Sequence, residues 1–324
     1  MNRIPSFRKF NYSLRPGKNI ERKMLAELFG RLAVFRPVAE YCYIGLGSIY
    51  FTDFALFHRQ WGFSPMFSIE GDTEGIERAL FNVPFDCVQV LSGRTENHLP
   101  TMSFSYPTIV WLDYDYELSN TVLQDVQTVV QRQCEAGYSG VVILVTVDVE
   151  SERLSNPKSV DDDQLEDWPD DPVEQFRMLV GETNIPANIS RIDLRPPDLA
   201  TTYQKLITNK IHGTLADISG WNYSQFANFR YADGAEMATF GGLIYKEGDE
   251  ESQANARFES LNYFRDGSEP YWIRNPLLTF REMHLLSRAI ENSEAAKEIP
   301  ITDEDKQRFK ELYRYIPAYV EAEL

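Results

Sequence analysis

The sequence predicts a doubly wound α/β fold: a mostly parallel sheet of about seven strands, closed by an antiparallel hairpin. Three observations support this fold class. Short apolar segments alternate with segments of helical spacing between residues 41 and 147. Residues 141–147 are apolar almost throughout, which is typical of a parallel strand covered on both faces. Further on, Asp233-Gly234 separates two strand-like segments, as in a two-residue hairpin turn.

The first unit of this fold runs from residue 41 to about residue 60. Residues 41–44 are aromatic and β-branched, which favours a buried strand, and Gly45 and Gly47 follow at once. Glycine lets the backbone approach a ligand without a Cβ clash. We expect Ser48 to cap the helix that follows. A strand, a glycine turn and a helix in this order form the nucleotide-binding corner of doubly wound folds.

Later strands place further polar residues at the same edge. Residues 66–69 are apolar and end at Glu70, and an acid about 20 residues after the glycine turn can hold ribose hydroxyls. Residues 85–91 and 108–112 read as the third and fourth strands. Ligands of such sheets bind beyond the carboxyl ends of the strands. The residues that we expect to converge there are Gly45, Glu70, Gly93 and Asp113.

Helical segments and loops fill the intervals between these strands. Ser119 and Thr302 are the expected caps of helices at 120–136 and from 303, and Asn19 of a helix at 20–32. The remaining predicted helices are 74–81, 173–180, 199–210 and 280–290, and residues 100–107 and 246–276 are predicted loops.

The charge of the chain limits its partners. The chain has 324 residues, of which 43% are hydrophobic, and a net charge of −17. Binding to duplex nucleic acid relies on Lys and Arg that displace counterions, so we expect no such partner and no anionic membrane surface. No apolar segment approaches the roughly 20 residues of a membrane span, and the basic N-terminus has no apolar signal core. We expect a cytoplasmic protein.

We divide the chain into three parts. Residues 1–40 form a basic arm and a helix, residues 41–246 form the α/β domain, and residues 247–324 form a loop and helices that pack on it. Residues 148–174 are an acidic insertion with eleven acids and two bases. We interpret it as a surface loop or flexible segment that could bind a partner protein. No glycine-turned ligand loop surrounds its acids, so we expect no metal site.

Arg15 and Lys18 are unusual cations for so acidic a chain. One interpretation is a solvated arm. The other is that both side chains reach back to a carboxylate or phosphate of a substrate or cofactor in the central cleft.

The arrangement resembles the class I S-adenosylmethionine-dependent methyltransferases, which have a Rossmann-like fold. The resemblance includes the parallel strands, the Gly-x-Gly corner, the acids after the second and fourth strands, and the closing hairpin. More narrowly, three segments look like a bacterial family known as "putative O-methyltransferases". They are residues 14–24 (Leu-Arg-Pro-Gly-Lys-Asn-Ile-Glu-Arg-Lys-Met), 43–51 (Tyr-Ile-Gly-Leu-Gly-Ser-Ile-Tyr-Phe) and 110–115 (Val-Trp-Leu-Asp-Tyr-Asp).

The resemblance implies S-adenosylmethionine as cofactor and a role for each matching position. The turn of Gly45, Leu46, Gly47 and Ser48 would pass under the methionine part. Glu70 would accept hydrogen bonds from the ribose, and Gly93 and Arg94 would flank the adenine. Asp113 would face the sulfonium and the substrate. The chain departs from the family pattern at Ile49, where a third glycine is usual, and at Arg94, where many members have an acid.

Methyl transfer requires alignment of the nucleophile, the methyl carbon and the leaving group, and a hydroxyl nucleophile also benefits from a base. Asp113 and Asp115 are the candidate bases, and His98 is a further one in a loop near the same edge.

Three functions follow from these patterns. The first is an S-adenosylmethionine-dependent methyltransferase, with O-methyl transfer to a small molecule or a protein side chain. The second is a methyltransferase-like module that has lost catalysis and binds a partner. The third is a nucleotide-binding enzyme or sensor in which Arg94, Arg15 or Lys18 meets phosphates.

Overall fold

The computed structural model describes residues 15–71, 75–160 and 162–317. The basic arm over residues 1–14 and the predicted start of a helix at residue 74 lie outside this part. The strands are β1 (Cys42–Leu46), β2 (Met66–Glu70), β3 (Val88–Ser92), β4 (Thr108–Glu117), β5 (Val141–Asp148), β6 (Trp221–Asp233), β7 (Ala235–Lys246) and β8 (Tyr271–Trp272). The helices are α1 (Pro16–Gly30), α2 (Thr52–Trp61), α3 (Ile76–Phe81), α4 (Thr95–His98), α5 (Asn120–Ala136), α6 (Pro172–Val180), α7 (Asp198–Ala216), α8 (Glu250–Asn255), α9 (Phe280–Arg288), α10 (Ser293–Lys297) and α11 (Asp303–Leu312).

Within the described residues the strands form one sheet in the order β3-β2-β1-β4-β5-β7-β6-β8. The first five of these are parallel, and β7 joins β5 antiparallel as one arm of the β6–β7 hairpin. This confirms the doubly wound, mostly parallel α/β fold with its closing hairpin. The two-residue strand β8, which pairs parallel with β6, lies in a segment that was predicted as a loop.

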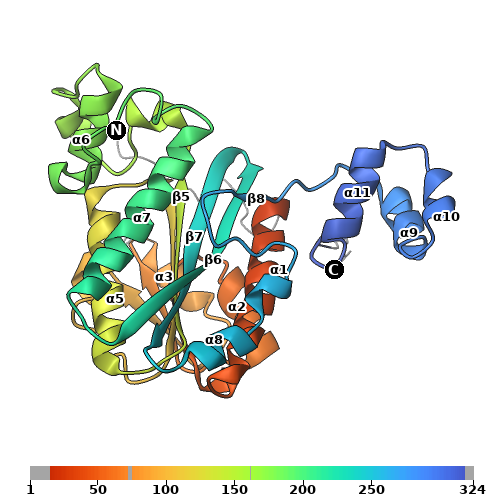
Figure 1. Cartoon of the computed structure of the whole chain (residues 1–324), viewed down its shortest axis with the longest axis horizontal. Coiled ribbons are helices and arrows are strands. Elements are labelled where there is room, and N and C mark those ends of the chain that lie inside the picture. The colour runs from red at the N-terminus through yellow and green to blue at the C-terminus, as the bar shows by residue number, and fades with distance from the viewer. Residues whose placement is uncertain (1–14, 72–74, 161, 318–324) are drawn as a thin grey trace.

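Helices cover both faces of the sheet (Figure 1). Successive residues of a strand point to opposite faces. Ile44 packs in the hydrophobic cluster that contains α5, α6 and α7, whereas Tyr43 packs in the cluster that contains α1 and α2. The continuous apolar segment of β5 is buried along its whole length. The prediction of a sheet covered on both faces is therefore confirmed.

Two helices begin elsewhere than the sequence predicted. Helix α1 starts at Pro16 rather than after Asn19, because Asp233 of the hairpin turn accepts hydrogen bonds from the backbone N–H groups of Gly17 (3.0 Å) and Lys18 (2.8 Å). Helix α2 starts at Thr52, and Ser48 instead accepts from the backbone N–H of Tyr50 in the preceding turn at 3.2 Å. The predicted caps Ser119 and Thr302 are confirmed.

The last three helices lie to one side of the α/β body (Figure 1). Leu286, Ile299 and Phe309 form a small hydrophobic cluster within this group. Leu312 and Tyr315, at its end, join the large cluster that contains α1. The residues after 247 thus pack on the α/β domain only in part. Among the described residues, no helix combines the length and apolar character that crossing a membrane requires.

Candidate functional site

A pocket of about 740 Å³ opens at the carboxyl ends of the parallel strands, beside the start of α1. It brings together residues that are far apart in the sequence and that come from neighbouring strands β2, β1 and β4. The predicted site residues that line it are Arg15, Lys18, Leu46, Gly47, Ser48, Glu70, Gly93, Arg94, Asp113 and Asp115. Of the four residues that we expected to converge, Glu70, Gly93 and Asp113 line the pocket.

Gly45 does not line this pocket, which corrects its assignment to the ligand turn. It lies inside β1, paired with Ser68 and Trp111 of the neighbouring strands. A Cβ atom at this position would come within 2.8 Å of the Tyr43 hydroxyl oxygen. The glycine at position 45 therefore makes room for the chain's own tyrosine rather than for a ligand.

Gly47 allows the turn to lie directly against the end of β2. Its N–H donates to the carbonyl oxygen of Ile69 at 2.6 Å. A Cβ atom at this position would lie 2.7 Å from Ser68 Oγ and 2.9 Å from Glu70 Oε2. The absence of a side chain at Gly47 thus lets the carboxylate of Glu70, a residue that is only 6% exposed, lie over the turn at the pocket wall.

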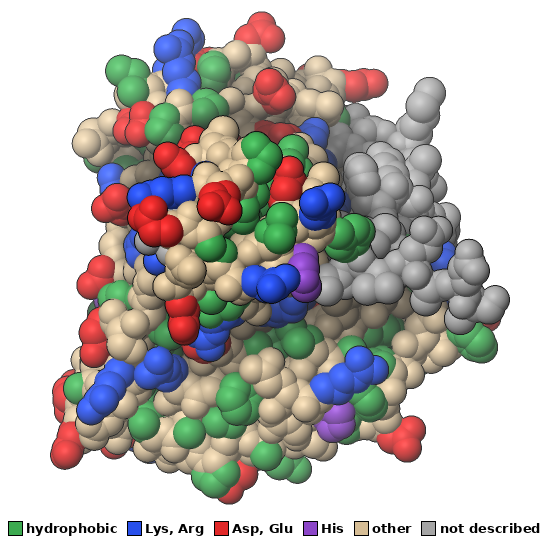
Figure 2. Space-filling view, turned by 90° about the vertical axis from the view of Figure 1, so that its right-hand side faces the viewer, with side chains coloured by type: hydrophobic (Ala, Val, Ile, Leu, Met, Phe, Trp, Pro, Cys, Tyr) green, Lys and Arg blue, Asp and Glu red, His purple; other side chains and the backbone are tan. Residues whose placement is uncertain are grey.

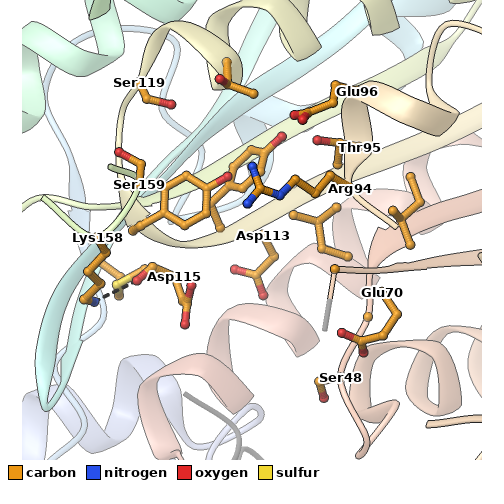
Figure 3. A pocket seen from close by; sticks show the side chains of 18 of the residues that line it. Ser48, Glu70, Arg94, Thr95, Glu96, Asp113, Asp115, Ser119, Lys158 and Ser159 are labelled. Carbon is orange, nitrogen blue, oxygen red and sulfur yellow. Dashed lines mark hydrogen bonds between the residues drawn. The ribbon is translucent and has the colours of Figure 1, made fainter. Parts of the chain in front are cut away.

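Gly93 continues this wall after β3. Its φ of +129° belongs to the region that glycine adopts readily, and its N–H donates to the carbonyl oxygen of Glu70 at 2.9 Å. The exposed side chain of Arg94 extends from here into the pocket (Figure 3). His98 is not among the lining residues, because it ends α4 and its Nε2 lies 2.9 Å from the carbonyl oxygen of Ser92. The structure therefore gives His98 no place as a base in this pocket.

Asp113 and Asp115 both line the pocket, although strand β4 extends past the end that the sequence predicted. The ladder between β4 and β5 is irregular between Asp113 and Glu117. The backbone carbonyl of Asp115 accepts a hydrogen bond from Lys158 Nζ at 2.8 Å, and Figure 3 shows the two residues side by side. The two aspartates thus reach the cavity from within the strand.

Lys18 is held inside the protein by acids. Its Nζ lies 2.6 Å from Asp113 Oδ1 and 2.8 Å from Glu21 Oε2, and 4.2 Å from the centre of the Trp111 ring. Only 2% of Lys18 is exposed. Burial raises the pKa of Glu21, and the nearby Lys18 ammonium opposes this rise. Lys18 therefore reaches the central cleft, but the carboxylates that it meets there belong to the chain itself, and its contact with a substrate or cofactor stays a prediction.

The acidic insertion covers one side of the pocket. Glu117 is fully buried at the end of β4 and accepts hydrogen bonds from the backbone N–H groups of Lys158 (3.0 Å) and Ser159 (2.8 Å). Lys158 Nζ also lies 3.0 Å from Oδ2 of Asp148, which is buried at the end of β5. These contacts anchor the insertion to the sheet and bring Val160 to the pocket wall.

A buried carboxyl braces the wall next to Arg94. Asp125 on α5 accepts hydrogen bonds from Thr95 Oγ1 and the Tyr114 hydroxyl, each at 2.5 Å. Burial raises the pKa of Asp125, and the two donors act in the opposite direction. Thr95 and Tyr114 both line the pocket, so Asp125 fixes part of its shape from behind.

Sequence reasoning missed four charged residues of the pocket, of which Glu96 and Lys158 come from α4 and the acidic insertion. The other two, Arg22 and Asp53, line the pocket from α1 and α2. The spacing of Arg15, Lys18 and Arg22 along the chain is the signal that could have found the first, because residues three and four apart share one face of a helix. No comparable signal marks Asp53.

Several solved structures resemble this chain at a distance. An O-methyltransferase described as putative, from Klebsiella pneumoniae, is 9% identical with a TM-score of 0.38, and the match covers 70% of this chain and 79% of that chain. An O-methyltransferase from Bacillus cereus in complex with SAH is 12% identical with a TM-score of 0.36, covering 70% and 81%. An SAH-bound methyltransferase from Podospora anserina is 11% identical with a TM-score of 0.38, covering 74% and 82%.

Comparison with curated proteins finds no match. The model of one family, described as "Putative O-methyltransferase", matches residues 10–324, which is nearly the whole chain. The match includes all three segments on which the resemblance to this family was based, and it confirms that prediction. The chain therefore belongs to this family of putative O-methyltransferases.

Proposed function

We propose that this protein is an S-adenosylmethionine-dependent methyltransferase that acts on an oxygen atom of a small molecule. The observation that carries the proposal is the meeting of the Gly47 turn, the Glu70 carboxylate and the Asp113 carboxylate at one pocket, from three neighbouring parallel strands. The description of the family supports the same reaction.

The residues present fit an adenosyl group. At Gly47 a Cβ would come within 3 Å of Glu70, so the absence of a side chain lets the Glu70 carboxylate lie against the turn at the pocket wall. In our proposal the Glu70 carboxylate accepts hydrogen bonds from the ribose hydroxyls, because a carboxylate can accept from two donors at once. Leu46 and Ser48 complete this wall, and Gly93 and Arg94 lie beside the adenine.

In the proposed mechanism the chain aligns the acceptor and removes its proton. S-adenosylmethionine supplies a methyl group that its positively charged sulfur activates. The ion pair with Lys18 uses Oδ1 of Asp113, and we assign acceptance of the hydroxyl proton to Oδ2. Asp115 lines the same cavity and is the second candidate for this role.

The walls of the pocket favour a small acceptor over a protein side chain. Val160 of the insertion and Met178 and Leu179 of α6 line the cavity, and these apolar side chains suit a small organic acceptor. On the face in Figure 2, Lys and Arg side chains are interspersed with Asp and Glu, which supports our expectation that duplex nucleic acid is not the substrate. A partner-binding role of the acidic insertion stays a prediction.

Isothermal titration calorimetry with S-adenosylhomocysteine tests the proposal. We expect micromolar binding to the parent protein and a loss of at least about tenfold in Glu70→Gln, which removes a charged acceptor. Glu77→Gln, which changes an exposed acid of α3, is the matched control and should bind as the parent does. ATP and AMP, titrated in parallel, separate the alternatives. Binding of these nucleotides alone would select a nucleotide sensor, and binding of none of the three would select a module that has lost its cofactor.

A further inference from the structure

Arg22 is a buried cation with two nitrogen atoms that have no hydrogen-bond acceptor among the described residues. It lies one helical turn after Lys18 on α1, is 4% exposed and lines the pocket. Its Nε and Nη1 atoms are buried and have no hydrogen-bond partner in the part of the chain that the structure describes. Because an unpaired charge is costly inside a protein, a guanidinium in this state indicates that a ligand completes its contacts.

The neighbouring cation of α1, Lys18, differs from Arg22 because acids of the chain pair with it. Lys18 is as deeply buried as Arg22, but Asp113 and Glu21 both pair with it. Arg22 forms no ion pair within 4 Å with any described acid. The charge of Arg22 is thus available to the pocket, whereas that of Lys18 is already neutralised within the chain.

Asp53 gives the surroundings of Arg22 a second, opposite charge. It lies in the first turn of α2, lines the same pocket, and accepts a hydrogen bond from the Tyr43 hydroxyl at 2.6 Å through Oδ2. Burial raises the pKa of Asp53, and the charge of Arg22 opposes this rise. A cation and an acid that face one cavity suit a ligand that carries both an anion and an ammonium group.

We propose that Arg22 binds the carboxylate at the amino-acid end of the methyl donor, with Asp53 beside the ammonium group. A planar guanidinium matches a carboxylate through two parallel hydrogen bonds, one from Nη2 and one from either Nε or Nη1, and in Arg22 both Nε and Nη1 lack a partner among the described residues. The assignment rests on the proposed function. It also orients the ligand, because Glu70 holds the ribose and Arg22 holds the opposite end.

Calorimetry with two ligands tests this assignment. One is S-adenosylhomocysteine, and the other is its decarboxylated analogue, 5′-(3-aminopropylthio)-5′-deoxyadenosine. The parent protein should prefer the carboxylate-bearing ligand by at least about tenfold. Arg22→Gln should lose this preference, because its affinity for S-adenosylhomocysteine should fall while its affinity for the decarboxylated analogue stays the same. Lys23→Gln removes a charge from the next position of α1, outside the pocket lining, and should leave both affinities unchanged.

The stability of the ligand-free protein gives a second readout. Arg22→Met alone would leave the buried Asp53 without the cation that faces it, so the double variant Arg22→Met/Asp53→Asn, which removes both charges, is used, and its Tm without ligand should equal or exceed that of the parent. A lower Tm would indicate a structural arginine and overturn the assignment. Equal binding of S-adenosylhomocysteine by the parent and Arg22→Gln would overturn it as well, while leaving the proposed function intact. If the parent itself does not bind S-adenosylhomocysteine, the proposed function fails and this assignment fails with it.

Discussion

Replacement of Gly47 by alanine tests whether the glycine turn serves the pocket. The new Cβ would lie 2.7 Å from Ser68 Oγ, 2.9 Å from Glu70 Oε2 and 3.2 Å from the Ile69 carbonyl oxygen. The turn cannot retreat freely, because Gly47 N–H donates to that carbonyl at 2.6 Å. Ser68 is fully buried, so the carboxylate of Glu70, at the end of a longer side chain, should move first.

Two effects of Gly47→Ala follow, and each has a magnitude. Crowding of a packed region costs about 1–3 kcal/mol of the free energy of unfolding. Displacement of the carboxylate should remove at least one charge-assisted hydrogen bond to the ribose, worth about 1.5–3 kcal/mol, or about tenfold or more in the dissociation constant. Urea denaturation measures the first effect, and calorimetry with S-adenosylhomocysteine measures the second.

The matched control is Gly213→Ala in α7, where the added Cβ would meet no described atom within 4 Å beyond the backbone of its own helix. This variant should be more stable than the parent by up to about 1 kcal/mol, because alanine favours a helix, and should bind S-adenosylhomocysteine unchanged. If Gly47→Ala bound the ligand as tightly as the parent protein, the role that we give to this turn would be refuted.

Three further predictions concern buried acids and their partners. Lys18→Met leaves Glu21 without its cation and should lower the free energy of unfolding, measured by urea denaturation, by about 3–5 kcal/mol. The double variant Lys18→Met/Glu21→Gln should recover most of this loss. A Lys18→Met protein as stable as the parent would contradict the prediction. Burial raises the pKa of Asp125, so the folded protein keeps this proton to a higher pH than the unfolded chain, and the associated stability is lost as the pH rises. Asp125→Asn should therefore gain stability relative to the parent as the pH rises above the usual aspartate pKa, whereas a difference in the free energy of unfolding that stays constant with pH would argue against the shift. Glu117→Ala leaves two backbone N–H groups without their acceptor, so hydrogen exchange at Lys158 and Ser159 should quicken; unchanged exchange there would show that the insertion is held by other contacts.

The parallel part of the sheet was predictable because local sequence determines its strands. An apolar segment such as β5 can be stable only where both faces are covered, and the observed strand is buried throughout. The acid at the end of β2 was also predictable, since Glu70 follows directly on an apolar strand. Strand β8 was not predictable in the same way, because two residues are too few to show a period.

The start of α1 depends on a residue more than 200 positions away. Asn19 has a side chain that suits a helix cap, but Asp233 accepts the first N–H groups instead and allows the helix to begin at Pro16. A sequence pattern carries no sign of such a contact. The same shift places Lys18 inside the helix, one turn before Arg22, and so determines which cations face the pocket.

The residues of the site divide in the same way, into those that local sequence predicts and those that depend on contacts with other parts of the chain. Gly47 follows β1 and Glu70 ends β2, as the local sequence predicts, whereas Asp113 lies within β4, which runs past its predicted end; all three line the pocket. Gly45 belongs to the same motif, yet the neighbouring Tyr43 ring determines its surroundings. Lys158 reaches the pocket through long-range hydrogen bonds to the sheet, which the acidic character of the insertion did not indicate.

A crystal structure of the protein soaked with S-adenosylhomocysteine tests the central claim most directly. Our account predicts ribose hydroxyls within hydrogen-bond distance of the Glu70 carboxylate and the sulfur on the side of Asp113. An adenosyl group bound outside this pocket, or a pocket that its own side chains close to the ligand, would contradict the account.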